Sequence, residues 1–110
     1  MRYEISEKGN STVLQINEER FDAKLAPEFR AQIEALMGDL STHLVLDIGD
    51  VKFMDSSGLG AVMGVYKLLR DKKISVANPQ KPVRDLFKLT RMDRLIKTYD
   101  SVDAALATAV

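Results

Sequence analysis

The sequence of 110 residues contains no cysteine and a single histidine, His43. The absence of cysteine excludes disulfides and thiolate chemistry, and it fits a reducing compartment. One histidine is too few for a histidine-rich metal site, and we predict no metal or other cofactor. The 16 basic and 16 acidic residues cancel, so no overall field attracts nucleic acid or an anionic membrane.

Long apolar segments are also missing. No uncharged apolar run approaches the roughly 20 residues of a membrane helix, and charges occupy the N-terminal positions where a signal peptide has its apolar core. A chain of 110 residues, 45% of them hydrophobic, is long enough for one core but not for two. We therefore expect a single cytoplasmic domain over residues 1–110, monomeric when free, with no membrane insertion and no nucleic-acid partner.

Hydrophobic periodicity predicts alternating strands and helices. Alternation at 3–6 and 11–17 around a glycine turn indicates a hairpin, and the dense apolar run at 43–54 indicates one central strand buried on both faces. Shorter runs at 72–79 and 94–99 predict two more strands. Helical periodicity predicts four helices, at 21–38, 57–71, 81–92 and 100–109. The predicted fold is α/β, with a mixed, mostly parallel sheet of four to five strands and about four helices.

The segment DSSGLG, residues 55–60, lies where the central strand should give way to a helix. Serine at a helix start commonly caps free backbone amides, and either Ser56 or Ser57 can do so. Capping needs only one hydroxyl and gives no reason for Asp55 beside a second serine. Asp55 itself is either solvated or positions the serine.

Two enzymatic interpretations of this segment lack part of their pattern. Gly58, Gly60 and Gly64 form G-x-G-x-x-x-G, which is one residue longer than the dinucleotide fingerprint and is not followed by its acidic residue. A nucleophilic serine would need the G-x-S-x-G elbow, and His43 lies at the far end of the predicted strand. The sequence therefore disfavours a nucleotide-binding or hydrolytic enzyme, and we expect no catalytic residue.

A third interpretation makes the serine a substrate. A phosphoryl group at a helix N-terminus meets unsatisfied amides and the positive end of the helix dipole, so the fold tolerates it. It also adds about −1.5 to −2 charges beside Asp55. Such a charge would abolish docking of an apolar or acidic partner without unfolding the chain.

The helix that follows is more apolar than contact with a sheet requires. A helix on a sheet needs one apolar stripe roughly 100° wide, but here Ala61, Val65 and Leu68 add a second stripe to the one that contains Leu59. The second stripe either packs beside a neighbouring helix or forms an exposed patch for a partner.

The segments FMDSSGLGAVMGVYKLL, LVLDIGDVK and RFDAKLAPEFRAQIEAL resemble the STAS domain of bacterial anti-sigma factor antagonists. The resemblance covers nearly the whole chain and is most specific at D-S-S-G-L-G. It implies a non-enzymatic regulator whose unphosphorylated form binds an anti-sigma factor with serine kinase activity and thereby releases a client. The kinase then uses ATP and Mg²⁺ to phosphorylate the antagonist, and a metal-dependent serine phosphatase reverses the modification.

The resemblance also assigns roles to individual residues. It implies that Ser56, directly after Asp55, is phosphorylated and that Ser57 keeps a capping and neighbouring role. Asp22 matches the family's aspartate before the first helix, beside the phosphosite, and it equally suits a cap of that helix. The preceding loop, residues 17–20, is charged and lacks the family's glycine, which is expected to alter partner choice.

Two groups of residues follow from the resemblance. The predicted neighbours of the phosphosite are Asp22, Asp55, Ser57 and Gly58. The family favours a partner-facing role for part of the second stripe, so the predicted partner-binding residues are Phe21, Asp22, Met54, Ser57, Leu59, Ala61, Val65 and Leu68. The alternative function is a STAS accessory subunit of a membrane transport ATPase that is never phosphorylated and needs no serine at position 56.

Overall fold

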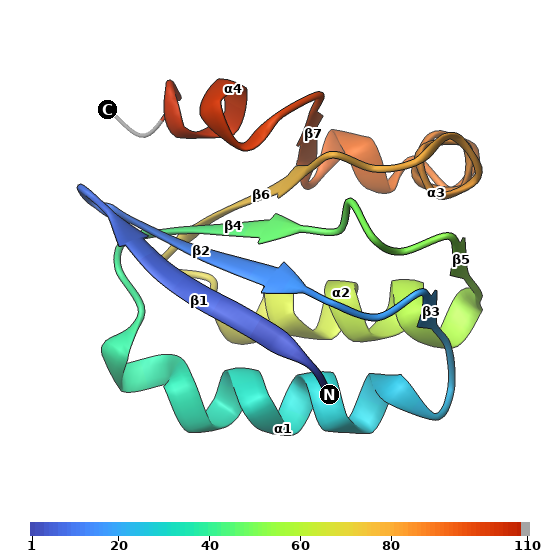
Figure 1. The fold of residues 1–110 in the computed structure, drawn as a ribbon, viewed down its shortest axis with the longest axis horizontal. Coiled ribbons are helices and arrows are strands. Elements are labelled where there is room, and N and C mark those ends of the chain that lie inside the picture. The colour runs from blue at the N-terminus through green and yellow to red at the C-terminus, as the bar shows by residue number, and fades with distance from the viewer. Residues whose placement is uncertain (109–110) are drawn as a thin grey trace.

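The computed structural model describes residues 1–108, and its main element is a five-stranded sheet (Figure 1). The strands, in the order β1-β2-β4-β6-β7, are β1 (Tyr3–Lys8), β2 (Ser11–Ile16), β4 (His43–Asp47), β6 (Lys73–Ala77) and β7 (Lys97–Tyr99). β1 is antiparallel to β2, and every other neighbouring pair is parallel. The predicted mixed, mostly parallel sheet is therefore confirmed.

The opening hairpin turns at Gly9, whose φ of 62° lies in the left-handed region that favours glycine. Lys8 and Ser11 pair across this turn. β1 forms one edge of the sheet and is mostly exposed, whereas β2 is mostly buried.

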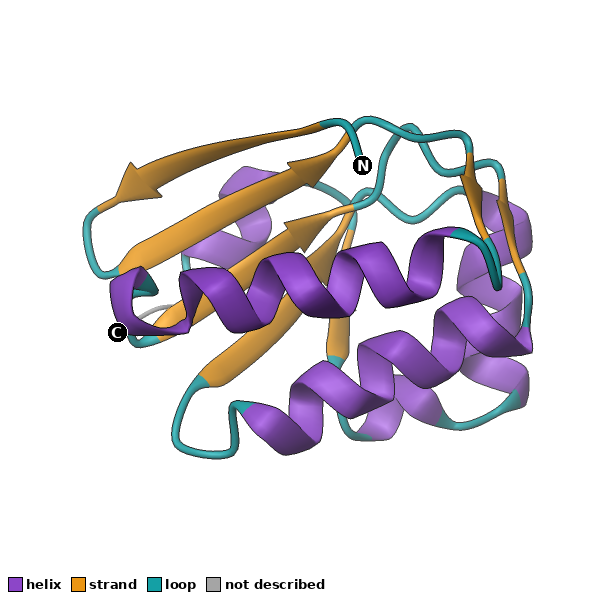
Figure 2. Cartoon of the chain, turned by 90° about the horizontal axis from the view of Figure 1, so that it is seen from below, coloured by secondary structure: helices purple, strands orange, loops and turns teal. Residues whose placement is uncertain are grey.

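Residues 1–108 form four α-helices, as predicted: α1 (Leu25–Leu36), α2 (Ser56–Leu68), α3 (Lys81–Leu89) and α4 (Val102–Leu106). α1 and α2 lie side by side over one face of the sheet, which Figure 2 shows from below. α4 packs against β4, β6 and β7 on the opposite face (Figure 1). None of these helices is both long enough and apolar enough to span a membrane.

The apolar run 43–54 does not form the single central strand that the sequence predicted. It forms β4, a turn, and a second strand β5 (Phe53–Met54), which pairs in parallel with β3 (Arg20–Phe21) as a separate two-stranded ribbon. The Asp47 side chain explains the break, because its Oδ1 accepts hydrogen bonds from the Gly49 amide at 3.0 Å and from Asn78 Nδ2 at 3.1 Å. These bonds turn the chain out of the main sheet.

The helix ends also differ from the sequence pattern. α1 is followed by a 3-10 helix, η1 (Met37–Asp39), and α3 ends at Leu89, before a second one, η2 (Met92–Arg94). Arg91 adopts a left-handed φ of 60° between α3 and η2. Leu89, the last residue of α3, is 82% exposed, and Thr90 after it is exposed too. α4 ends at Leu106, and position 109 of the predicted last helix lies outside the described residues.

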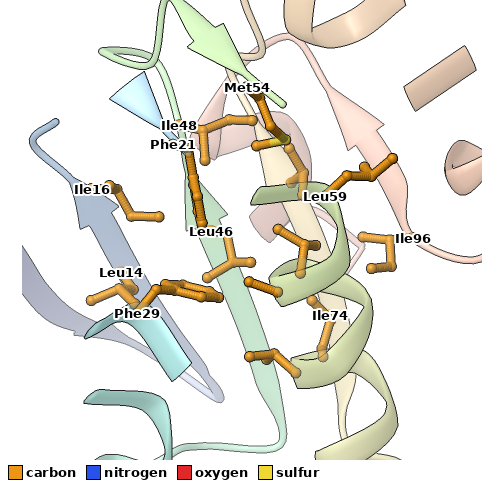
Figure 3. Packing of buried hydrophobic residues seen from close by; sticks show 14 of the residues in the cluster. Leu14, Ile16, Phe21, Phe29, Leu46, Ile48, Met54, Leu59, Ile74 and Ile96 are labelled. Carbon is orange, nitrogen blue, oxygen red and sulfur yellow. The ribbon is translucent and has the colours of Figure 1, made fainter. Parts of the chain in front are cut away.

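Strand alternation divides the core between the two faces of the sheet. Leu14 and Leu46 face α1 and α2 in the larger cluster, where they meet Phe29 of α1 (Figure 3). Val13 and Val45, one residue away in each strand, belong to a small cluster under α4. The larger cluster continues to Phe21, Met54 and Leu59 around the β3–β5 ribbon (Figure 3), so the start of α2 rests on the main core.

Candidate phosphorylation site

The cap of α2 is Asp55, not a serine. Asp55 has extended backbone angles (φ −104°, ψ −174°), and its Oδ1 accepts a hydrogen bond from the Gly58 amide at 3.0 Å. Ser56 is therefore the first residue inside the helix. The interpretation of a serine, Ser56 or Ser57, as the cap was wrong, and so was that of Asp55 as merely solvated. The reason is that the helix begins one residue earlier than the pattern predicted, which moves the capping position from a serine to the aspartate.

Because Asp55 provides the cap, both serine hydroxyls remain at the surface. Ser56 and Ser57 are exposed, and within residues 1–108 neither Oγ makes a hydrogen bond. A hydroxyl that the fold does not use can be modified without loss of a structural bond. The N-terminal end of α2 also offers its positive dipole end to an anion at this position.

The β3–β5 ribbon fixes the start of α2 against the loop before α1. The Asp55 amide donates to the Phe21 carbonyl at 3.4 Å. A Cβ added to Gly58 would collide with that carbonyl oxygen and would come within 2.9 Å of Met54 Cγ. A glycine at position 58 is thus required for the close approach of α2 to β3, and this approach brings β3, which Asp22 follows, against the start of α2.

Asp22 caps the first turn of α1, which confirms one of the roles predicted for it. Its Oδ1 accepts from the amides of Lys24 at 3.1 Å and Leu25 at 3.3 Å, and its Oδ2 lies 3.4 Å from Arg20 Nε. These bonds, that from the Leu25 amide first, lower the pKa of the Asp22 carboxyl. The carboxylate is therefore charged at neutral pH, one residue after Phe21, whose carbonyl accepts from the Asp55 amide.

Most of the apolar residues predicted to bind a partner are buried. Phe21 and Val65 are fully buried, and Phe21 packs edge-on against the Phe29 ring with 4.9 Å between ring centroids. The other buried members of the predicted set are Met54, Leu59 and Ala61. For these five residues, direct contact with a partner does not fit the structure. Of the rest, Ser57 is exposed and Asp22 and Leu68 are partly exposed.

The second apolar stripe of α2 is covered by α1, which is the first of the two explanations that the sequence allowed. α1 and α2 are in contact, and the guanidinium of Arg30 on α1 lies over Gly64 of α2. Val65 is buried in the main core, to which α1 contributes Phe29 and Ile33. The surplus of apolar residues thus reflects two neighbours, the sheet and α1.

Sequence reasoning missed Phe53, an exposed aromatic residue three positions before Ser56. Phe53 is 41% exposed on the β3–β5 ribbon, and the guanidinium carbon of Arg20 lies 4.4 Å from the centroid of its ring. A signal was present, because Phe53 alternates with the buried Met54. The dense run of apolar residues hid this alternation.

The enzymatic interpretations gain no support from the geometry. Gly58, Gly60 and Gly64 all lie within the helix α2, so they do not form a loop of free amides around a phosphate. His43 is buried between Ser11 Oγ, 2.9 Å from its Nδ1, and Ser75 Oγ, 2.8 Å from its Nε2. Both ring nitrogens are engaged, so His43 is not positioned to act as a base for Ser56.

Comparison with known proteins identifies the domain family of this chain. Residues 2–105 match the family model of the STAS domain. An anti-sigma F factor antagonist from Paenibacillus polymyxa is 35% identical over 75 residues, which cover 66% of this chain and 64% of that protein. The match therefore spans just under two thirds of this curated relative.

Solved structures share the fold. The crystal structure of an anti-sigma factor antagonist from Mycobacterium paratuberculosis superposes with a TM-score of 0.86 at 24% identity, covering 96% of this chain and 91% of that one. The Bacillus cell fate determinant SpoIIAA in its phosphorylated form gives a TM-score of 0.72 at 18% identity, covering 99% of this chain and 100% of that one. With the family model matching nearly the whole sequence, the chain belongs to the STAS domain family.

Proposed function

We propose that this chain is a phosphorylation-controlled anti-sigma factor antagonist. Its unphosphorylated form binds an anti-sigma factor that has serine kinase activity, and the bound anti-sigma factor releases its client. Phosphorylation of Ser56 ends the binding, and a metal-dependent serine phosphatase restores it. Because the kinase consumes ATP, the proposal places the chain in the cytoplasm.

The observation that carries the proposal is that Asp55 and Ser56 have different roles at the start of α2. Asp55 caps the helix through its bond to the Gly58 amide, and Ser56 Oγ is exposed and has no partner within residues 1–108. The name of the Paenibacillus relative, an anti-sigma F factor antagonist, supports the regulatory role. The phosphorylated form recorded for SpoIIAA supports the type of modification.

In the proposed reaction this chain supplies only the acceptor. Ser56 Oγ forms a bond to the γ-phosphorus of ATP as the bond from that phosphorus to ADP breaks, and the hydroxyl proton passes to a base on the kinase. The product adds about −1.5 to −2 charges at a helix N-terminus. The helix dipole favours this charge, so the fold persists.

The surface responds differently from the fold. Asp55 caps α2 with its carboxylate, and a second carboxylate, that of Asp22, follows Phe21, whose carbonyl accepts from the Asp55 amide. A phosphate beside them makes this surface strongly anionic, and an apolar or acidic partner surface would be repelled. The switch therefore changes binding while leaving the domain folded.

The test is phosphorylation of the purified chain by the serine-kinase anti-sigma factor of the same genome, with ATP and Mg²⁺, followed by intact-mass measurement. We expect one added phosphoryl group on the wild type and on Ser57→Ala, and none on Ser56→Ala. A wild-type chain that stays unmodified would favour the transporter accessory subunit instead. A phosphoryl group on the Ser56→Ala protein would contradict the assignment to Ser56.

A further inference from the structure

The outer edge of β1 has backbone groups that the sheet leaves unpaired. β1 is the end strand of the sheet (Figure 2), and all of its residues except Tyr3 are exposed. The Asn17 amide donates to the Arg2 carbonyl at 2.9 Å, so Arg2 and every second residue after it direct their backbone groups toward β2. The amides and carbonyls of Tyr3, Ile5 and Glu7 therefore point to the free edge of the sheet.

β1 also has two opposite charges that the fold does not use. Glu4 and Lys8 are exposed, and neither side chain forms an ion pair or a hydrogen bond within residues 1–108. Glu7, by contrast, accepts from Thr12 Oγ1 at 2.8 Å and from Ser41 Oγ at 2.6 Å. Because side chains alternate along a strand, Glu4 and Lys8 lie on the same face of β1, at opposite ends of it.

These two charges are complementary to an identical strand that runs antiparallel. If Ser6 lies opposite Ser6 of a second copy, Glu4 lies opposite Lys8 of that copy and Lys8 opposite its Glu4, so both charges gain a partner. The same register places Ile5 opposite Glu7 of the second copy, and both residues direct their backbone groups to the free edge. A shift of one strand by two residues puts either Glu4 or Lys8 opposite Ser6 and removes both ion pairs.

We propose that β1 pairs antiparallel with β1 of a second copy of this chain, centred on Ser6, so that the two sheets join edge to edge in a two-fold symmetric dimer. Backbone hydrogen bonds join Ile5 and Glu7 across the junction, and an ion pair between Glu4 and Lys8 closes each end. Charged side chains on an edge strand usually discourage pairing, but here their order favours one partner, a second β1. The contact is small, so the dimer forms at high protein concentration and the monomer expected from the sequence is its dilute form.

Sedimentation equilibrium of the purified chain over a range of concentrations tests the dimer, and it does not involve the proposed kinase. Glu4→Lys and Lys8→Glu should each weaken association at least about tenfold, because each places like charges opposite one another. The double variant should restore it. The two single changes alter the net charge in opposite directions, so a loss in both is not an effect of net charge. Asp71→Lys, at an exposed position beyond α2, should associate as the parent does.

The register can be tested separately, because the chain contains no cysteine. Opposite residues of a non-hydrogen-bonded pair have Cα atoms about 4.5 Å apart, within the range of a disulfide. Ser6→Cys should therefore form a disulfide-linked dimer on mild oxidation, and Ser57→Cys, also at an exposed serine, should form much less. A chain that stays monomeric at every concentration would overturn the proposal. So would a dimer that both single charge reversals leave unchanged, or equal cross-linking at positions 6 and 57.

Discussion

Two pairs of serines in this domain have opposite relations to the fold. Ser11 and Ser75 are fully buried, and both hydroxyls are hydrogen-bonded to the ring of His43. Ser56 and Ser57 are exposed at the start of α2, where the neighbouring aspartate makes the structural bond.

The comparison shows that the environment, not the residue type, decides whether a hydroxyl is available for chemistry. A buried hydroxyl must have a partner, since leaving it unpaired costs about 1–3 kcal/mol. An exposed hydroxyl next to a residue that already caps the helix does not need a partner within the protein. Substitutions in the buried group should therefore affect stability, and substitutions at the exposed serines should affect only modification and binding.

The largest expected effect on stability is that of His43→Ala. This change leaves the Ser11 and Ser75 hydroxyls buried without their partner, and we expect the free energy of unfolding to fall by about 3 kcal/mol. Urea denaturation followed by circular dichroism measures it. A loss below about 0.5 kcal/mol would mean that the buried chain of hydrogen bonds contributes nothing to the fold.

The next largest effect is expected at the cap. Asp55→Ala removes the acceptor for the Gly58 amide and should lower the free energy of unfolding by about 1 kcal/mol. Asp55→Ser keeps a capping side chain and should retain most of that stability. If Ser57→Ala proved more destabilising than Asp55→Ala in the same denaturation experiment, the cap would belong to Ser57.

A smaller effect should appear on acidification. Burial first, and Lys73 second, lower the pKa of the His43 ring from its ordinary 6.5. The folded state thus favours neutral His43 while the unfolded chain binds a proton, so stability is complete above about pH 6.5 and declines as the pH falls.

Thermal unfolding at pH 7.5 and at pH 5.0 measures this effect. The carboxyl groups of Glu18, Asp22 and Asp85 also have lowered pKa values, but they protonate at lower pH. Replacement of the ring by His43→Gln should remove most of the difference between the two pH values. An undiminished difference in that variant would assign the effect to another group.

The smallest effects on stability are expected at the exposed pair. Ser56→Ala and Ser57→Ala remove hydroxyls that make no bond within residues 1–108, so each should change the free energy of unfolding by less than about 0.5 kcal/mol. Differential scanning calorimetry is sufficient to check this. If the free energy of unfolding of either variant fell by about 1 kcal/mol or more, the hydroxyl removed would contribute to the stability of the fold.

Periodicity in the sequence predicted the sheet and the helices, because burial of one or two faces of an element determines the spacing of its apolar residues. It did not predict the break after β4. The Asp47 side chain accepts a local hydrogen bond from the Gly49 amide and a second one from Asn78, 31 residues away. The local pattern of residues does not report the second, distant partner.

The candidate site shows the same limit at a finer scale. Asp55, Ser56 and Ser57 are all residue types that cap helices well. Which of them is the cap changes when the start of the helix shifts by a single residue. The second apolar stripe of α2 was compatible with a buried surface and with a partner-binding surface, and in the structure Val65 of this stripe is buried in the main core. Phe53 became visible as a surface residue only with the β3–β5 ribbon in place.

The most direct test compares the chain phosphorylated on Ser56 with the unmodified chain, by thermal unfolding and by affinity for the kinase. We predict an almost unchanged midpoint of unfolding together with affinity lowered roughly 100-fold. A domain that unfolds on phosphorylation, or a phosphorylated domain that binds as tightly as before, would contradict a switch that acts at the surface and leaves the fold intact.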